Sequence, residues 1–379
     1  MSFLSRNLLV AIILTMVLGM LFIGLYPFVY FPPNKVFLGA TGNGLHFYAR
    51  GIALSTGDDG WSNNDHSGNP ITLELWVKPA RTYYRKIPHI LSLCDVSGRE
   101  VLYLGQWKNS LIVRLMEDSR WIKAIKKEIG TVDVFNPGEK VLITLVLNKK
   151  SAYIYLNGHL VRKYDGFDFT KTVSKHPIRS LVLGNSSTGD SPWRGEISGF
   201  TAWNIALGPT AIFDRFEQRN LGKSSQTGEE FIKYTFEKTE NGIIRNKARS
   251  DWNLIIPEIL TPLRREFLGM PSKQFLQKRS FYKDSVINVA GFIPFGYVLT
   301  VFFSGISLKK YSILNFIFPI LIGGLLSLFI ETNQVFLVTR SSSMTDLVLN
   351  ILGTGLGAGV YWRRKVIVPS FKFQISKKT

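Results

Sequence analysis

The sequence predicts a mixed fold, in which an all-β sandwich is inserted into a four-helix α-helical transmembrane domain. Three observations support this prediction. Residues 1–32 and 284–362 are strongly apolar, whereas residues 35–283 are polar and basic. The apolar runs are long enough to cross a bilayer. The polar part contains many short alternating runs, which are typical of β-strands.

The first element is an apolar stretch at residues 8–31. A cleaved signal peptide is the competing interpretation, but the stretch is longer than a signal core and no small-residue cleavage site follows it. Tyr26, Tyr30 and Phe31 lie where interfacial aromatic residues are common. We therefore expect an uncleaved anchor within an N-terminal segment 1–34.

Residues 35–260 are predicted to form the sandwich. Alternating runs occur at residues 71–79, 101–105, 110–116, 141–148, 151–162, 181–185 and 194–204. Asn157-Gly158 is a hairpin turn signal. Residues 209–218 suggest a short helix. Many short strands separated by turns, with little helix, are typical of a β-sandwich.

Residues 261–283 form a basic juxtamembrane linker in which Lys and Arg alternate with Phe, Leu and Tyr. Such a mixture suits a lipid interface, and Pro271 prevents one long helix. The net charge of +19 likewise favours anionic partners. Because apolar spans flank the basic region, membrane lipid and envelope polymers are the expected partners, and nucleic acid is not.

Three further spans are predicted at residues 284–304, 312–330 and 344–362, all within segment 284–362, before a basic tail at 363–379. The tail and the loop around Lys309-Lys310 are basic, which predicts that they are cytoplasmic. Four spans then place both termini in the cytoplasm and the sandwich outside, in a multi-pass protein of a bacterial cytoplasmic (inner) membrane.

Polar side chains interrupt these spans at the ends that this topology places outside. The candidate membrane site contains Asp284, Asn288, Glu331, Gln334, Arg340, Asp346 and Asn350. Ionisable groups in spans face inward or toward water and indicate function. A second set is expected to shape helix packing: Gly291, Pro294, Gly296, Gly353 and Gly357.

Structural roles remain open for several of these residues. Asp346 follows three serines and could cap a helix as a first-turn acid. Asn288 and Asn350 could bond across helices and hold a bundle together.

No cofactor or metal site is predicted. Asp58, Asp59 and Asp65 leave calcium as an alternative in the sandwich, but their spacing matches no dedicated calcium loop. The histidines show no metal-ligand spacing. Cys94 has no partner for an intrachain disulfide, and we expect it to be a buried small side chain.

The polar motifs carry a family resemblance. Asp284-Ser-Val-Ile-Asn288-Val-Ala-Gly-Phe-Ile-Pro294-Phe-Gly296, Glu331-Thr-Asn-Gln334, Arg340 and Asp346-Leu-Val-Leu-Asn350-Ile-Leu-Gly353 resemble the pattern of VanZ-like membrane proteins. The resemblance covers about 282–360, with 8–31 as the first span. It implies a cell-envelope role linked to glycopeptide-antibiotic resistance, without an established reaction. The 250-residue insertion after the first span departs from the family.

The inserted strands resemble the laminin-G-like or concanavalin-A-like jelly roll over about 40–218. Thr72-Leu-Glu-Leu-Trp76, Tyr155-Leu-Asn157-Gly158 and Trp193-Arg-Gly195-Glu-Ile-Ser-Gly-Phe200 carry this resemblance. It implies glycan or protein binding. No strand has a Glu-x-Asp-x-x-Glu pattern, so glycoside hydrolysis lacks candidates. Trp61, Trp107 and Trp193 could stack on sugars, although core packing is the commoner role.

Two functional hypotheses follow, and the sequence leaves open whether the protein is an enzyme. The first is a binding or envelope-protection protein whose sandwich engages a cell-wall glycan or an envelope protein. The second is a membrane enzyme or flippase for a lipid-linked headgroup, in which Arg340 grips phosphate and a carboxylate moves a proton. An open pocket lined by the membrane-site residues would favour the second hypothesis, and a closed, hydrogen-bonded cluster would favour the first.

Overall fold

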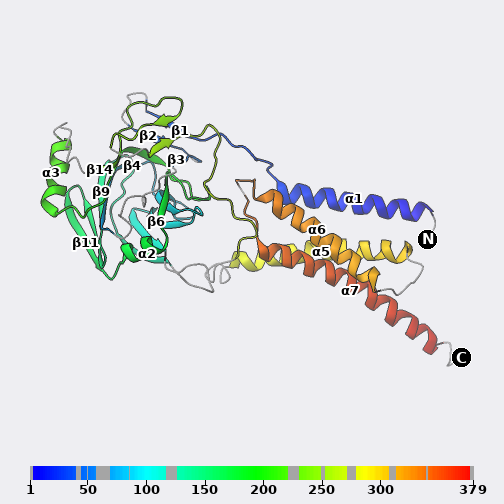
Figure 1. Ribbon diagram of the computed structural model, residues 1–379. Helices are drawn as coiled ribbons and strands as arrows, with labels where there is room; N and C mark the ends of the chain where they lie inside the picture. The colour runs from blue at the N-terminus through cyan, green and yellow to red at the C-terminus, as the bar shows by residue number, and fades with distance from the viewer. Residues whose placement is uncertain are drawn as a thin grey trace. The chain divides into compact units, whose positions relative to one another are not determined.

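The computed structural model describes residues 3–39, 44–48, 50–56, 69–84, 86–116, 126–220, 230–248, 252–270, 279–306, 313–338 and 340–375. The chain forms two compact units. The sandwich unit is Phe31–Arg265, and the helical unit combines Met1–Tyr30 with Glu266–Thr379. Figure 1 shows the strands gathered in one unit and the long helices in the other.

The sandwich unit is built from two antiparallel sheets, each with eight strands among the described residues. The first has the order β1 (Val36–Leu38), β2 (Leu45–Phe47), β13 (Gly195–Trp203), β4 (Ile71–Pro79), β9 (Val141–Leu147), β10 (Ser151–Leu156) and β11 (His159–Asp165), with β14 (Glu230–Tyr234) also paired to β13. The second has the order β15 (Ile243–Ile244), β16 (Asn253–Ile255), β3 (Ala53–Thr56), β12 (Ile178–Leu183), β5 (His89–Asp95), β6 (Glu100–Trp107), β7 (Ser110–Met116) and β8 (Lys126–Thr131).

Strand β4 shows why the alternating pattern forms this sandwich. Leu73 and Leu75 are fully buried in a core that also contains residues of the second sheet. Glu74 lies on the opposite face and is also buried, because helix α3 (Pro209–Asn220) covers it. Arg215 of α3 bonds the Glu74 carboxylate through Nε at 3.3 Å. The alternation therefore separates a core face from a helix-covered face, rather than a core face from solvent.

The sequence predicted one local element of the sandwich, a hairpin turn, and missed another, a short helix. The Asn157-Gly158 turn between β10 and β11 has φ values of 49° and 81°, as its hairpin sequence predicts. Helix α2 (Phe169–Lys175) was not predicted, because seven residues are too short to show a helical period. Its local signal is Asp168, whose side chain accepts the backbone N–H of Lys171 at 2.9 Å and so caps the helix.

The helical unit consists of α1 (Phe3–Leu25), α5 (Arg279–Ile306), α6 (Leu314–Gln334) and α7 (Met344–Ile375), which pack against one another. Three segments among the described residues are long and apolar enough to span a membrane: Arg6–Leu25, Phe281–Ile306 and Leu314–Gln334. Helix α7 is not among them. The prediction of four spans thus exceeds this finding by one, since polar residues and glycines lower the hydropathy of α7.

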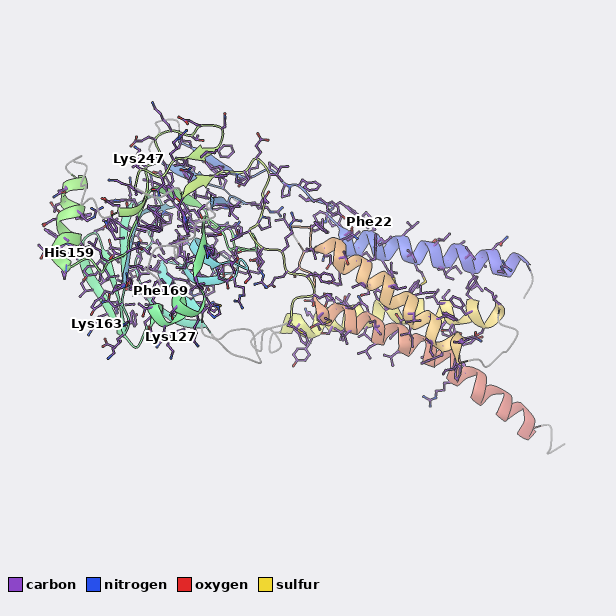
Figure 2. All side chains as sticks on the ribbon, in the orientation of Figure 1. Phe22, Lys127, His159, Lys163, Phe169 and Lys247 are labelled. Atoms are coloured by element: carbon purple, nitrogen blue, oxygen red, sulfur yellow. The ribbon has the colours of Figure 1, made fainter. Side chains whose placement is uncertain are left out.

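Aromatic residues gather at the end of α1. Phe22, labelled on α1 in Figure 2, is 58% exposed. Its ring lies 5.7 Å from the rings of both Tyr26 and Phe28. Exposed rings of this kind suit an interface between lipid and water.

Candidate functional site

Glu331 joins two helices of the helical unit. It lies in the last turn of α6 and is 2% exposed. Its Oε2 accepts the backbone N–H of Ser343 at 2.7 Å, directly before α7. The first N–H groups of a helix lack partners within the helix and carry partial positive charge, so a carboxylate there is stabilising.

Asp346 stands in the first turn of α7, beside the same junction. Its backbone N–H donates to Oγ of Ser343 at 3.3 Å, so Ser343 acts as the N-cap of α7. Asn288 and Asp284 of α5 lie close enough to the Asp346 carboxylate to act on it electrostatically. The structure therefore brings together four of the predicted site residues, Asp284, Asn288, Glu331 and Asp346.

Asn350 is buried one turn further along α7, with 5% of its surface exposed. Its Nδ2 donates to Oγ of Ser327 in α6 at 2.9 Å. Among the described residues its Oδ1 has no hydrogen-bond partner. The contact with Ser327 links two helices, which is the structural role considered for this amide.

Arg340 and Gln334 point to a different place, the end of α1. Arg340 donates from Nε to the carbonyl of Tyr26 at 3.1 Å and from Nη2 to that of Ile23 at 3.0 Å. Gln334 donates to the carbonyl of Gly24 at 2.9 Å. A cation suits a helix C-terminus, where carbonyls lack partners. Arg340 therefore holds α1 in this structure, and its bonds differ from the predicted grip on a phosphate.

Three of the five predicted packing residues lie at a contact between helices. A Cβ at Gly353 would meet the carbonyl of Val289, and one at Gly357 would lie 2.7 Å from N of Tyr297, both in α5. A Cβ at Gly296 would lie 2.8 Å from Cα of Thr354 in α7. These three glycines allow α5 and α7 to approach closely.

Gly291 and Pro294 differ from that expectation. A Cβ at Gly291 would meet nothing within 4 Å, so this glycine shapes no described helix contact. Pro294 is exposed within α5. Sequence reasoning also missed Gly323 and Thr354, which lie against each other between α6 and α7. Their signal was a small residue at helical spacing from predicted site residues.

The buried part of the membrane site is thus closed, whereas Asp284 and Arg340 are exposed. Glu331, Gln334 and Asn350 are buried and each bonds a neighbouring element. Among the described residues, no group of three or more His, Cys, Asp or Glu side chains could hold a metal ion.

The sandwich unit, in contrast, carries an open cavity with aromatic walls. Its volume is about 350 Å³, and its lining includes Arg81, Tyr83, Tyr84, Lys86 and Asp190. Tyr83 is 74% exposed, whereas Tyr84 is buried beneath the Arg81 guanidinium, 4.4 Å from its ring centroid. Burial would raise the pKa of Asp190, but the Lys86 ammonium and neighbouring hydroxyls outweigh burial and hold that pKa well below its ordinary value.

Of the tryptophans expected as alternative sugar platforms, Trp107 and Trp193 are not among the described residues that line this cavity. Trp193 is fully buried, as core packing predicts, and Trp107 is 43% exposed elsewhere. Trp61 and the acidic loop with Asp58, Asp59 and Asp65 lie outside the described residues. Cys94 is buried, as expected.

Comparison with solved structures gives only distant similarities. The chain is similar to the receptor-binding domain of botulinum neurotoxin type G, with 16% identity and a TM-score of 0.38, over 50% of this chain and 45% of that one. It is also similar to a Bacteroides ovatus protein described as a candidate carbohydrate-binding protein, with 16% identity and a TM-score of 0.39, over 60% and 59% of the two chains. The chain thus spans about half the length of these structures. No curated protein matches it.

Two protein families match separate parts of the chain. Residues 221–368 match VanZ/LLP1. This range begins before β14 and includes α5, α6 and α7 up to residue 368, while α1 lies outside it. Residues 55–213 match the Laminin_G_3 family of the concanavalin A-like lectin/glucanases superfamily. The chain therefore joins a VanZ-like membrane region to a laminin-G-like, concanavalin-A-like domain.

Proposed function

We propose that the protein is a multi-pass protein of a bacterial cytoplasmic membrane whose sandwich unit binds a cell-wall glycan outside the cell. All four long helices cross the membrane in this proposal, with both termini in the cytoplasm. Its role is envelope protection, which includes reduced sensitivity to glycopeptide antibiotics. The VanZ-like and lectin-like matches support this assignment.

The observation that carries the proposal is the contrast between the two units. In the helical unit, the bonds of Glu331, Arg340 and Asn350 hold helices together. In the sandwich unit, Tyr83 stands exposed at an open cavity beside the ion pair of Lys86 and Asp190, whose atoms are 3.2 Å apart. An exposed ring offers an apolar face to a sugar, and the nearby charges and hydroxyls offer partners for sugar hydroxyls.

Two alternatives remain. The sandwich could engage an envelope protein instead of a glycan. The membrane site could also process a lipid-linked headgroup, and the proximity of Asp284 and Asp346 favours this because paired carboxylates suit acid–base chemistry. The exposed position of Asp284 would give a headgroup access.

A binding experiment tests the glycan proposal. The full chain in nanodiscs is titrated with soluble peptidoglycan fragments, together with Tyr83→Ala and the control Tyr48→Ala. Tyr48 is 55% exposed and does not line the cavity. Loss of one stacking contact should weaken binding about tenfold in Tyr83→Ala alone. Equal affinities for all three proteins would contradict the proposal.

A second experiment separates the membrane alternatives. Glu331→Gln, Arg340→Ala and Asp346→Asn are compared for membrane level and glycopeptide sensitivity. Changed sensitivity at normal level in Glu331→Gln and Asp346→Asn would favour headgroup chemistry. Normal levels with unchanged sensitivity in all three would exclude the site from that phenotype. For the topology, a reporter fused after residue 283 should be extracytoplasmic, and a cytoplasmic result would overturn the arrangement.

A further inference from the structure

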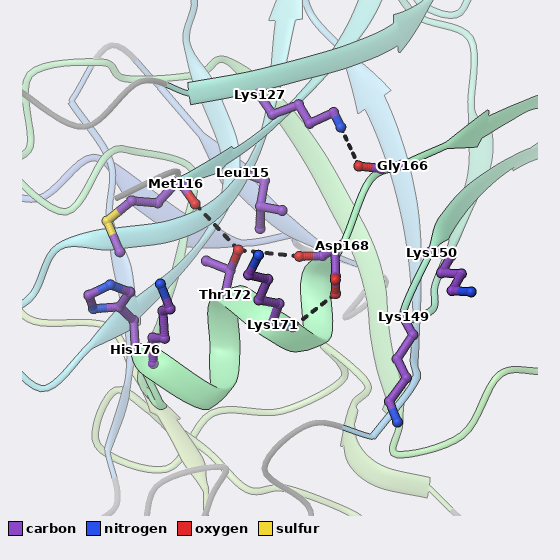
Figure 3. A pocket seen from close by; sticks show the side chains of 11 residues that line it. Leu115, Met116, Lys127, Lys149, Lys150, Gly166, Asp168, Lys171, Thr172 and His176 are labelled. Atoms are coloured by element: carbon purple, nitrogen blue, oxygen red, sulfur yellow. Dashed lines mark hydrogen bonds between the residues drawn. The ribbon is translucent and has the colours of Figure 1, made fainter. Parts of the chain in front are cut away.

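A second cavity on the sandwich unit is lined by several basic residues. It has a volume of about 480 Å³ and lies among β7, β8, the turn between β9 and β10, and α2. Its basic residues are Lys127, Lys149, Lys150, Lys171, Lys175 and His176. Figure 3 shows that Lys127, Lys149 and Lys171 come from elements that are separated in the sequence.

Three of these basic side chains have no partner among the described residues. The side chains of Lys149, Lys150 and Lys171 have no hydrogen bond or ion pair with any described residue, and all three are exposed. The carboxylate that lines the cavity, Asp168, is used locally: Oδ1 accepts the backbone N–H of Lys171 at 2.9 Å and the hydroxyl of Thr170 at 3.1 Å. The cavity therefore keeps a positive potential, which attracts an anion.

The kind of cation indicates the kind of anion. A lysine ammonium is a compact point charge that suits phosphate, whereas planar arginine forks suit paired carboxylate oxygens. Lysines line the cavity, and no arginine is among the described residues that line it. Its volume lies within the range of small-ligand sites, which run from roughly 300 to 1,000 Å³. The exposed lysines lie at its rim, so an extended chain has access.

We propose that this cavity binds a glycan or polyol polymer linked by phosphodiesters, one repeat in the cavity and its neighbours along the exposed lysines. The inference rests on the proposed extracytoplasmic position of the sandwich, where such envelope polymers occur. It adds a second ligand class at a site separate from the cavity lined by Tyr83. Each phosphate bound releases counterions, so affinity falls as salt rises.

The test uses the full chain in nanodiscs of zwitterionic lipid, so that the lipid adds no competing charge. The probe is a glycerol-phosphate hexamer. The variant Lys149→Gln/Lys150→Gln/Lys171→Gln is compared with the control Lys78→Gln/Lys108→Gln/Lys238→Gln. The control removes the same charge from exposed lysines of the same unit outside the cavity. Thermal unfolding verifies that both variants fold.

We expect the cavity variant to bind the hexamer about 30-fold more weakly and the control less than threefold more weakly. Equal weakening in both would overturn the proposal, because it would show diffuse attraction. Tighter binding of hexagalacturonate would overturn the phosphate assignment, and tighter binding of a dT hexamer would assign the cavity to nucleic acid. Tyr83→Ala should leave hexamer binding unchanged. Absence of hexamer binding with intact peptidoglycan binding would refute this inference alone, and absence of both would refute the proposed function as well.

Discussion

Arg340→Ala should loosen α1 from the helical unit. The guanidinium makes two hydrogen bonds, of 3.1 and 3.0 Å, to carbonyls at the end of α1. Hydrogen bonds to charged groups are worth about 1.5–3 kcal/mol each when buried. Because Arg340 is exposed, we take about 1 kcal/mol for each bond, or about 2 kcal/mol in total. This energy corresponds to a roughly 30-fold decrease in the ratio of docked to undocked α1.

A disulfide measures this docking directly. A Cβ at Gly24 would lie 2.8 Å from Cγ2 of Ile330, so Gly24→Cys and Ile330→Cys bring two thiols within bonding distance. The native thiol, Cys94, is buried and should give little background. In this background, Arg340→Ala should slow disulfide formation and lower the unfolding temperature in detergent. Arg340→Lys keeps the charge with a different donor geometry, and we expect an intermediate rate.

The competing role of Arg340 predicts another result. If the guanidinium serves to bind a headgroup phosphate, Arg340→Ala should form the disulfide at the wild-type rate while antibiotic sensitivity changes. That outcome would refute the assignment of Arg340 to the end of α1. A slower rate with a parallel fall in membrane level would support the assignment.

Three further predictions address packing, buried charge and pH. Gly357→Val should destabilise the protein by about 1–3 kcal/mol, because the new side chain would overlap the α5 backbone. Gly291→Val places its side chain in open space and should not destabilise the protein. Thermal unfolding in detergent compares the two variants. Glu74→Gln should cost about 3 kcal/mol, because it removes the nearer of two carboxylates that pair with the buried Arg215 and leaves Glu230 at 3.9 Å. In denaturant titrations, Glu74→Met/Arg215→Met should recover much of this loss. Burial raises the pKa of Asp95, but hydrogen bonds from the following turn outweigh burial and lower that pKa. The destabilisation caused by Asp95→Asn should therefore be largest above about pH 4. It should disappear as the pH falls further, because the wild-type carboxylate becomes protonated.

The sequence predicts many helices and strands of both units, but it does not predict which of them contact one another. The strand at residues 71–79 and the Asn157-Gly158 turn follow from local pattern, and both occur as predicted. The close approach at Gly353 and the open space at Gly291 look equivalent in the sequence, since both are glycines within apolar runs. Which glycine faces a neighbouring helix depends on how its own helix is rotated about its axis. The sequence pattern alone does not show this rotation.

A long-range contact and a short helix could not be predicted from the sequence, for different physical reasons. Arg340 bonds residues more than 300 positions earlier, and no local pattern encodes that contact. Helix α2 is too short for periodicity, so the cavity that it completes with Lys171 and Lys175 was not foreseen. The basic composition of the domain was visible, but the gathering of its lysines around one space depends on the fold.

Two charged side chains of the helical unit follow the same electrostatic rule: each meets a helix end of opposite partial charge. The Glu331 carboxylate meets the N-terminal end of α7, which carries partial positive charge. The Arg340 guanidinium meets the C-terminal end of α1, which carries partial negative charge. Each ionisable group is thus matched in sign to a helix end that lacks backbone partners, and this explains both groups as packing contacts without a ligand. Lys149, Lys150 and Lys171 at the sandwich cavity have no such match among the described residues, so this unsatisfied charge, and with it the case for a ligand, lies on the sandwich.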